Sequence, residues 1–282
     1  MSCKRFTRGW YAFLAGVHAG PRKPAEDAGA KGETMLDTVL SDVPSEGVRT
    51  LTINRPSRRN ALDLATYTAL REALVAADHD PSVRAIVLAG AAGCFTSGND
   101  IVDFQNATLD EESPGILFLR ALTHLTKPLI AAVEGFAVGI GTTMLLHCDL
   151  VYAARGASFR LPFVPLGLCP EGASSYLLPR LAGAKQAAAL LFFGEPFTAE
   201  AAREYGLVND VTEDGEALPR AVKQAAKLAR LPAEAVRTTK ALLRRADAAV
   251  VQEAIGVEGE RFAALRLSPE AQAAFAAFLA RS

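Results

Sequence analysis

Two short stretches of the sequence combine residues that could do chemistry. Gly139-Ile140-Gly141 follows the apolar strand pattern of Leu129–Val133 and precedes an apolar helical pattern over residues 142–148. Glycines at such a junction let backbone N–H groups approach a ligand, with the positive end of the helix behind them. The second stretch is Pro170-Glu171-Gly172, a lone carboxylate among apolar neighbours. An anion-binding turn and an isolated acid would together suit a site that forms an enolate.

Glu171 has two interpretations from its local sequence. A carboxylate in an apolar setting can act as a general base. Pro-Glu-Gly at the start of a helix is also a favourable cap, because the carboxylate meets the positive end of the helix dipole. Burial would raise the pKa of this carboxyl and a helix terminus would lower it, so the local sequence leaves both interpretations open.

Three blocks of the sequence together resemble the crotonase (enoyl-CoA hydratase/isomerase) superfamily over residues 36–280. They are Asn54-Arg55-Pro56 with Asn60-Ala61-Leu62, then Phe-Thr-Ser-Gly-Asn-Asp at 95–100, then residues 135–149. The glycine turn alone is weak evidence, and it lacks the GxGxxG spacing of a dinucleotide-binding fold. Within the superfamily, the segments around Ile140 and Glu171 most resemble the Δ3,Δ2-enoyl-CoA isomerase branch.

The resemblance implies an oxyanion hole formed by the backbone N–H groups of Asn99 and Ile140. Each such donor lowers a barrier by about 3 kcal/mol. The side chains at both positions are expected to matter little. Asn99→Ala should therefore be nearly harmless, whereas Asn99→Pro would remove the N–H group and most of the turnover. Glu171 stands where the isomerase branch carries its catalytic base.

The sequence departs from the hydratases of this family at two positions. Hydratases carry two glutamates that hold and activate water, and the matching residues here are Thr143 and Phe163. Neither can act as a carboxylate base, so ordinary hydration is not expected. One carboxylate is enough to move a proton from C2 to C4, and Phe163 is suited to excluding water.

The resemblance also implies where a coenzyme A thioester would bind. The family holds the adenine and pantetheine mainly through backbone groups, with basic side chains at the phosphates. The substrate-binding candidates are Asn60, Ala61, Leu62, Gly98, Gly139, Gly141, Phe163 and Lys240. Arg58 and Arg59 are further candidates for the phosphates, although solvated surface charge is an equally good interpretation of all three basic residues. No cofactor is implied beyond the substrate itself.

Other polar residues near these blocks have structural interpretations. Glu134 and Asp149 are expected to be structural, Asp100 to shape its loop, and His124 and His147 to be packed side chains. No cluster of His, Cys or acidic residues has the spacing of a metal site, so no metal is expected.

The elements that must position these residues alternate between strand and helix up to about residue 211. Strand patterns occupy residues 48–54, 83–89, 129–133, 150–154, 158–161 and 207–211. Asp63, Thr198 and Ser268 are expected to cap helices, and only helical patterns follow Glu216. This order predicts an α/β core with a helical C-terminal extension. The resemblance implies a spiral of repeated strand-strand-helix turns.

Three regions are expected along the chain. Residues 1–34 are rich in Gly, Pro and Ala and are expected to be a disordered extension. Residues 35–215 would form the spiral core with the acyl-CoA site, and residues 216–282 a helical oligomerisation region. Phe262, Phe275 and Phe278 give that region apolar faces, and the family resemblance implies a homotrimer or a dimer of trimers.

Composition limits the other possible roles. The 282 residues carry a net charge of −1 with 50% hydrophobic residues, which gives no electrostatic case for nucleic acid. Four scattered cysteines indicate unpaired thiols in the cytoplasm. No apolar run is long enough to cross a membrane. Basic residues before residues 10–17 outline a secretory signal, but that run is short and broken by Gly16, so export is not expected.

These observations predict an acyl-CoA isomerase that moves a β,γ double bond to the α,β position. Other reactions of the same family are the first alternative: hydration by an atypical route, ring isomerisation or thioester hydrolysis. A protein that binds CoA thioesters without turnover is the second, if Glu171 only caps a helix.

Overall fold

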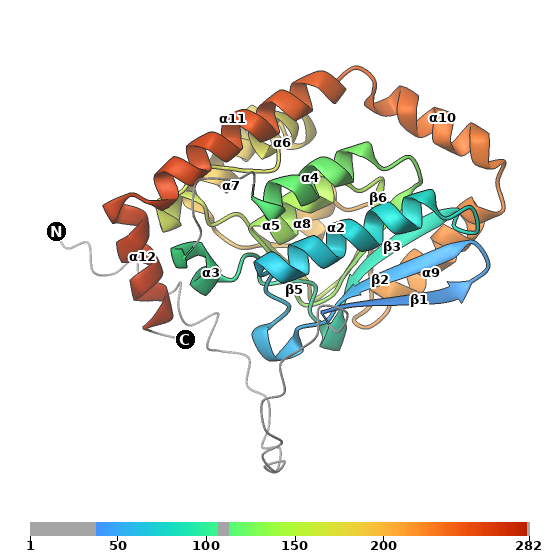
Figure 1. Cartoon of the computed structure of the whole chain (residues 1–282), viewed down its shortest axis with the longest axis horizontal. Helices are drawn as coiled ribbons and strands as arrows, with labels where there is room; N and C mark the ends of the chain where they lie inside the picture. Colours follow the sequence, from blue (N-terminus) through green and yellow to red (C-terminus); the bar gives the residue numbers. More distant parts are fainter. Residues whose placement is uncertain (1–37, 107–112, 281–282) are drawn as a thin grey trace, which may run out of the picture.

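Six strands form the larger of two sheets. The computed structural model describes residues 38–106 and 113–280 (Figure 1). In spatial order the strands are β1 (Val39–Ser45), β2 (Val48–Ile53), β3 (Ala85–Gly90), β4 (Leu129–Val133), β6 (Leu150–Ala154) and β9 (Asp210–Thr212). The β1–β2 pair is antiparallel and the other four pairs are parallel.

A second, smaller sheet leads into the glycine turn at Gly139, where the sequence predicted an anion-binding turn. It contains β5 (Phe136–Val138), β7 (Ser158–Arg160) and β8 (Phe197–Thr198). β5 and β7 are parallel, and β7 and β8 are antiparallel. The two sheets and the helices between their strands confirm the predicted α/β class.

The helices fall into an interleaved group and a C-terminal group. The first contains α2 (Leu64–His79), α3 (Ile101–Asn106), α4 (Pro114–His124), α5 (Ile140–Thr143), α6 (Ser174–Ala182), α7 (Ala184–Phe193) and α8 (Ala199–Glu204). The second contains α9 (Ala217–Ala229), α10 (Ala233–Arg244), α11 (Ala248–Arg266) and α12 (Pro269–Leu279). None of the helices described is both long and apolar enough to cross a membrane.

Alternate residues of the central strands enter two separate apolar layers. On β3, Ile86 and Leu88 belong to the main core with helices α2 and α4. Val87 faces the other side, where Ala221 and Ala225 of α9 pack on the sheet. Small alanines let α9 approach the sheet closely, and the period of two along the strand keeps the layers separate.

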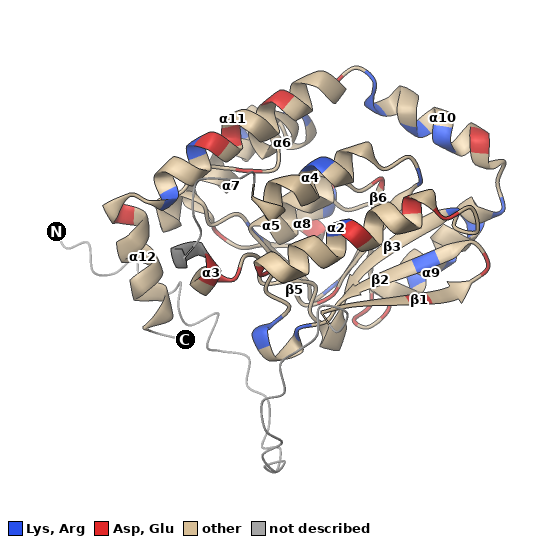
Figure 2. Ribbon diagram, in the orientation of Figure 1, with Lys and Arg blue, Asp and Glu red and all other residues tan. Residues whose placement is uncertain are grey.

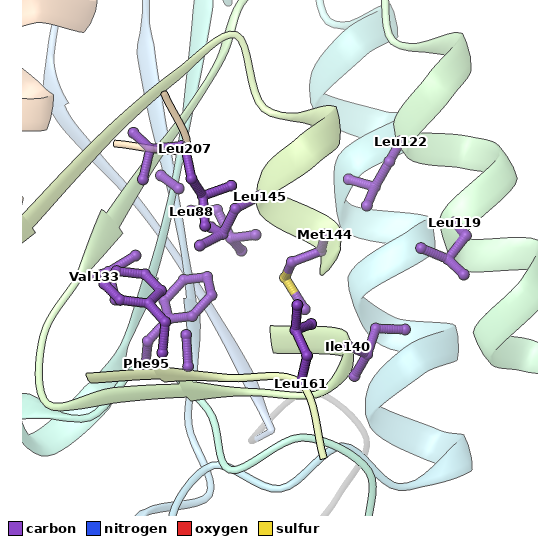
Figure 3. Packing of buried hydrophobic residues seen from close by; sticks show 14 of the residues in the cluster. Leu88, Phe95, Leu119, Leu122, Val133, Ile140, Met144, Leu145, Leu161 and Leu207 are labelled. Carbon is purple, nitrogen blue, oxygen red and sulfur yellow. The ribbon is translucent and has the colours of Figure 1, made fainter. Parts of the chain in front are cut away.

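The segment after the glycine turn lies in the middle of the main core. α5 continues into a short 3₁₀ helix, Met144–His147. Figure 3 shows Met144 and Leu145 between the strand residues Leu88 and Val133 and the α4 residue Leu119. Packing on both sides therefore fixes the direction of the backbone that leaves Gly139.

The predicted helix caps are confirmed. The side chains of Asp63, Thr198 and Ser268 accept hydrogen bonds from the N–H groups three residues later. Gly194 ends α7 with φ of 58°, a left-handed conformation that glycine adopts without a steric penalty.

Two predicted boundaries were wrong. The expected strand over residues 207–211 is mostly a turn, because the N–H groups of Leu207 and Val208 both donate to the Ala202 carbonyl and close α8. The strand β9 begins later, at Asp210. The expected helix over residues 142–148 instead begins at Ile140 and tightens into the 3₁₀ turn, ending at His147.

The C-terminal helices cover more of their own apolar surface than their sequence indicated. Phe275 is fully buried within the chain and Phe262 packs edge-on against Phe163, with ring centroids 6.3 Å apart. These two residues therefore do not form an uncovered face. The expected extension over residues 1–34 lies outside the described residues.

Asp149 joins the C-terminal helices to the sheet. Its Oδ2 accepts hydrogen bonds from Leu129 N–H at 2.7 Å and from Lys240 Nζ at 2.7 Å. Its Oδ1 accepts from an Arg244 nitrogen at 2.9 Å. Lys240 Nζ also donates to the Lys127 carbonyl at 2.6 Å, and its side chain is only 6% exposed. One carboxylate thus holds two cations of α10 against the start of β4.

We expect Asp149→Ala to lower the free energy of unfolding by about 3 kcal/mol, because it leaves the buried Lys240 ammonium without its counter-charge. Urea unfolding measures the effect. The matched control is Glu213→Ala, which removes an ion pair with Arg155 between exposed side chains and should leave the unfolding midpoint nearly unchanged. Equal midpoints for the two variants would contradict this assignment of Asp149.

Candidate active site

The loop that carries Asn99 runs parallel to strand β5. Thr96 pairs with Ala137 in a parallel bridge, and hydrogen bonds of 3.1 Å join the two segments on either side of that pair. Both segments then turn at a glycine with positive φ, Gly98 in one and Gly139 in the other, and Asn99 and Ile140 are the residues that follow these turns. The two turns lie close together although 41 residues separate them in the sequence.

Glycines permit this close approach. Gly98 has φ of 88°, and a Cβ there would lie 2.5 Å from the Val138 carbonyl oxygen. A Cβ on Gly141 would lie 2.5 Å from the Cγ2 of Thr96. Any larger residue at either position would push the two segments apart. Gly139, with φ of 56°, makes the turn between β5 and α5.

The backbone N–H groups of Asn99 and Ile140 donate no hydrogen bond within residues 38–106 and 113–280, whereas Gly139 N–H donates to the Arg160 carbonyl at 2.9 Å. The Ile140 side chain is 2% exposed and points into the packed core (Figure 3). What Ile140 offers a ligand is therefore its backbone N–H at the start of α5. Two backbone donors without a partner in the described residues, one after each glycine turn, are what the predicted oxyanion hole requires.

Asn60, Ala61 and Leu62 brace this loop. Their three N–H groups donate to the carbonyls of Arg55, Arg58 and Gly98, and their three carbonyls accept from Thr96, Arg55 and Asp100. The Asn60 amide also donates to two carbonyls of the loop at 2.6 and 3.0 Å. Since all three N–H groups are already paired, a backbone contact from these residues to a coenzyme A thioester would use their carbonyl oxygens, each of which has a second lone pair. They stay candidates for substrate binding, and they also position Gly98 and Asn99.

The side chain of Asn99 also has a partner. Its Oδ1 accepts a hydrogen bond of 2.5 Å from the Tyr67 hydroxyl on α2. Tyr67 is 3% exposed and packs against Phe118 with ring centroids 5.6 Å apart. The expectation that the Asn99 side chain matters little for turnover stays a prediction. The side chain has a structural role that the sequence did not indicate, because it satisfies a buried hydroxyl and fixes the loop to α2.

Glu171 lies in the turn before α6 and is 5% exposed. In the described part of the chain its side chain has one hydrogen-bond partner, the Thr143 hydroxyl, which donates to Oε1 at 2.5 Å. Burial raises the pKa of Glu171 to about 8, the Thr143 hydrogen bond opposes the shift, and the charge of Glu258 adds to it. This carboxyl can therefore both release and hold a proton near neutral pH.

Thr143 can serve both protonation states of Glu171. Its hydroxyl lies 2.5 Å from Glu171 Oε1 and 3.4 Å from the Ile140 carbonyl. It donates to Glu171 when that group is ionised. When Glu171 is protonated, the Thr143 hydroxyl can accept a hydrogen bond from the carboxyl group and donate one to the Ile140 carbonyl instead. The residue that replaces one hydratase glutamate thus orients the remaining acid.

Glu171 does not cap α6 with its side chain. The carboxylate that does so is Glu258 of α11, which accepts from Ala173 N–H at 2.6 Å and from Ser175 N–H at 2.9 Å. No sequence signal near Glu171 indicated this, because Glu258 is 87 residues away in the chain. The capping interpretation of Glu171 is replaced by one in which a different acid occupies the helix terminus.

A neutral histidine packs against the turn of Glu171, and Phe163 belongs to the main apolar core. Phe163 is 3% exposed and packs edge-on against Phe262 of α11. The ring of His147 lies behind the turn, with Nε2 2.8 Å from the Gly172 carbonyl, and burial lowers the pKa of His147 to about 4. Burial also raises the pKa of Tyr67, with the charge of Glu171 as the second cause. His147 is the packed side chain that the sequence predicted.

The basic candidates for phosphate binding differ in their placement. Arg58 and Arg59 are exposed, next to the 3₁₀ helix Pro56–Arg58, and remain candidates. Lys240 is buried and is paired with Asp149. A phosphate could bind Lys240 only by breaking that ion pair, so the predicted phosphate contact is replaced by a structural role. Glu134 is structural as expected, because it accepts from the N–H groups of Gly215 and Ala217 before α9.

Comparison with known proteins identifies the family of this chain. The family model for enoyl-CoA hydratase/isomerase matches residues 44–282. The 2,3-dehydroadipyl-CoA hydratase of Escherichia coli K12 is 36% identical, over 81% of this chain and 91% of its own length. Enoyl-CoA delta isomerase 2 of Rattus norvegicus is 35% identical, over 77% of this chain and 57% of its own length.

Solved structures show the same architecture. The structure of Pseudomonas aeruginosa OdaA superposes with a TM-score of 0.83 at 42% sequence identity, covering 86% of this chain and 99% of that one. The two sheets and the C-terminal helices are therefore those of a crotonase fold. The chain belongs to the enoyl-CoA hydratase/isomerase (crotonase) family.

Proposed function

We propose that this protein is an acyl-CoA isomerase that converts a 3-enoyl thioester into the 2-enoyl thioester. The observation that carries the proposal is the setting of Glu171, a carboxyl whose pKa burial raises to about 8 and whose hydrogen-bond partner is Thr143. Thr143 and the buried Phe163 stand where the hydratases of this family carry glutamates. A hydratase needs acid and base groups around a water molecule. An isomerase needs one group that takes a proton and returns it.

The proposed reaction uses two proton transfers at one carboxylate. Ionised Glu171 removes the C2 proton, and the C–H electrons move toward the thioester carbonyl to form a dienolate. The N–H groups of Asn99 and Ile140 bind the enolate oxygen. Protonated Glu171 then returns the proton at C4, the C3–C4 double bond becomes C2–C3, and the carbonyl is restored. Atoms and charge balance without a co-reactant.

Water exclusion supports isomerisation over hydration. Glu171 is 5% exposed, and Phe163, where hydratases carry a glutamate, is 3% exposed and forms an edge-on pair with Phe262. A dienolate beside so buried an acid is protonated by that acid, since little water reaches it. Both a named isomerase and a named hydratase match the chain at about the same identity, so the local chemistry, and not overall similarity, carries the choice.

We also propose that the chain assembles as a trimer or a dimer of trimers in the cytoplasm. Large apolar side chains are exposed on α10 and α11, namely Leu242, Leu243, Val250 and Val257. The free cysteines of the described residues, Cys94, Cys148 and Cys169, suit a reducing compartment. The C-terminal residues 216–282 would then provide most of the contact between copies.

Glu171→Gln should abolish isomerisation of 3-enoyl-CoA, because glutamine keeps the size of the side chain but cannot carry the proton. A positioned base contributes about 10² to 10⁴ in rate. In the wild type, kcat/KM should rise with pH up to about 8, since the base acts in its ionised form. Activity in Glu171→Gln above about one tenth of wild type would disprove the base assignment.

The wild-type protein should hydrate 2-enoyl-CoA at least about 10² times more slowly than it isomerises 3-enoyl-CoA, because no second carboxylate stands at Thr143 or Phe163. Loss of the enoyl absorbance measures hydration, and the same preparation serves for isomerisation. Comparable rates for the two reactions would place the protein with the hydratases.

Asn99→Ala should lower the free energy of unfolding by about 1–3 kcal/mol, since the buried Tyr67 hydroxyl loses its acceptor. Tyr67→Phe in the same chain should recover part of that loss, whereas fully additive effects would exclude the coupling. Asn99→Pro removes the N–H group and should lower kcat by about 10² to 10³. Calorimetry and turnover assays separate the two roles of Asn99.

Light scattering at micromolar concentration should give at least three times the mass of one chain. Leu243→Glu places a charge at the most exposed leucine of α10, which is 77% exposed, and should shift the protein toward smaller species. A wild type that stays monomeric would exclude the proposed assembly.

A further inference from the structure

Glu258 is a buried charge that the proposed reaction does not use. It lies on α11, and its side chain receives three hydrogen bonds from the start of α6. They come from Ala173 N–H at 2.6 Å, Ser175 N–H at 2.9 Å and the Ser175 hydroxyl at 2.5 Å. All three partners donate, so Glu258 accepts at each contact, as an ionised carboxylate does.

The start of α6 needs this external carboxylate. Its N-cap residue, Ala173, has φ of 57° and offers no side-chain cap. A left-handed alanine is strained, and the first N–H groups of a helix lack partners within the helix. Glu258 supplies both the acceptors and a negative charge at the positive end of the helix. Because Ala173 is two residues after Glu171, the contact fixes the turn that carries Glu171.

Glu258 and the aromatic cover of the site come from one face of α11. Phe262 is four residues after Glu258, so both side chains project from the same side of the helix. Phe262 packs on Phe163 while Glu258 binds the α6 terminus. The packing of one helix, α11, therefore positions both Phe262 against Phe163 and Glu258 at the start of α6.

We propose that Glu258 is a positioning residue for Glu171: it fixes the turn that carries Glu171 and places a second negative charge beside it. The proposal rests on the proposed function in taking Glu171 as the base. Because Glu258 lies on α11, the proton affinity of Glu171 would depend on how α11 packs against the start of α6.

Charges around Glu171 support an electrostatic role. The negative charge of Glu258 raises the pKa of Glu171. Its effect is smaller than the effects of burial and of the Thr143 hydrogen bond. Burial raises the pKa of Glu258 as well, and its hydrogen bonds to Ser175 and Ala173 oppose that shift. The other titratable groups near the turn are Tyr67 of α2, His147 before β6, Cys169 of the preceding loop, and Arg261 of α11.

The test is a ¹³C NMR titration of the Glu171 carboxyl in the full chain, with its signal assigned by loss in Glu171→Gln. Glu258→Gln removes the charge and keeps an acceptor, so the Glu171 midpoint should move to lower pH. A midpoint lower by about half a pH unit raises the ionised fraction about threefold at pH values well below the midpoint. Figure 2 shows further acidic residues on α11, and Glu260→Gln, at an exposed position, is the matched control that should not move the midpoint.

The pH profile of kcat/KM gives the second readout. Its acid limb should shift to lower pH in Glu258→Gln by the same amount as the NMR midpoint. If Glu258 only braces the fold, the variant loses thermal stability while both midpoints stay at the wild-type pH, and the proposal is overturned. If the wild type has no isomerase activity, the function proposed above fails, but the NMR titration still decides the coupling.

Ser175→Ala covers the case in which Glu258→Gln does not fold. Because the Ala173 and Ser175 N–H groups still donate, Glu258 stays ionised in this variant. Loss of the hydroxyl donor leaves the charge of Glu258 less screened, so the Glu171 midpoint should move to higher pH. An unchanged midpoint in a folded Ser175→Ala variant would count against the coupling.

Discussion

The candidate site depends on keeping a carboxyl group away from water. Glu171 is 5% exposed and has one side-chain hydrogen-bond partner in the described chain, Thr143. An ionised group in that position is costly, so the free energies of its two protonation states are brought close together near neutral pH. A group that must both take and return a proton needs this balance. Residues of α2, α6 and α11 lie around Glu171 and keep this carboxyl group buried.

Two carboxylates with different roles meet at the turn before α6, one that caps the helix and one that is the proposed base. A carboxylate at a helix terminus is stabilised in its charged form, which would make Glu171 a weaker base. Here Glu258 occupies the α6 terminus and leaves Glu171 to face Thr143. Two neighbouring acids thus have opposite tasks, set by the donors that each one meets. Three donors favour the ionised form of Glu258 against the effect of burial, whereas burial raises the pKa of Glu171 to about 8.

Local patterns predicted much of the fold, and long-range contacts account for what they missed. The caps at Asp63, Thr198 and Ser268 depend on residues three positions away, so the sequence reveals them. Strand β1 is largely exposed and has no apolar alternation to detect. The roles of Tyr67 and Glu258 depend on partners 32 and 83–85 residues away. The oxyanion pair was predicted only through family resemblance, because no local spacing relates Asn99 to Ile140.

Lys240 shows why charge alone is a poor guide to a ligand site. A lysine on an amphipathic C-terminal helix is a reasonable phosphate contact from sequence, yet its ammonium is buried against Asp149 and the Lys127 carbonyl. That ion pair holds α10 to the sheet, and α10 leads directly into α11. The charge network at Asp149 therefore supports the candidate site from a distance, because the path of α11 decides whether Glu258 reaches the start of α6 and Phe262 reaches Phe163. The sheets place the glycine turns, and the C-terminal helices hold the turn that carries Glu171, the proposed base.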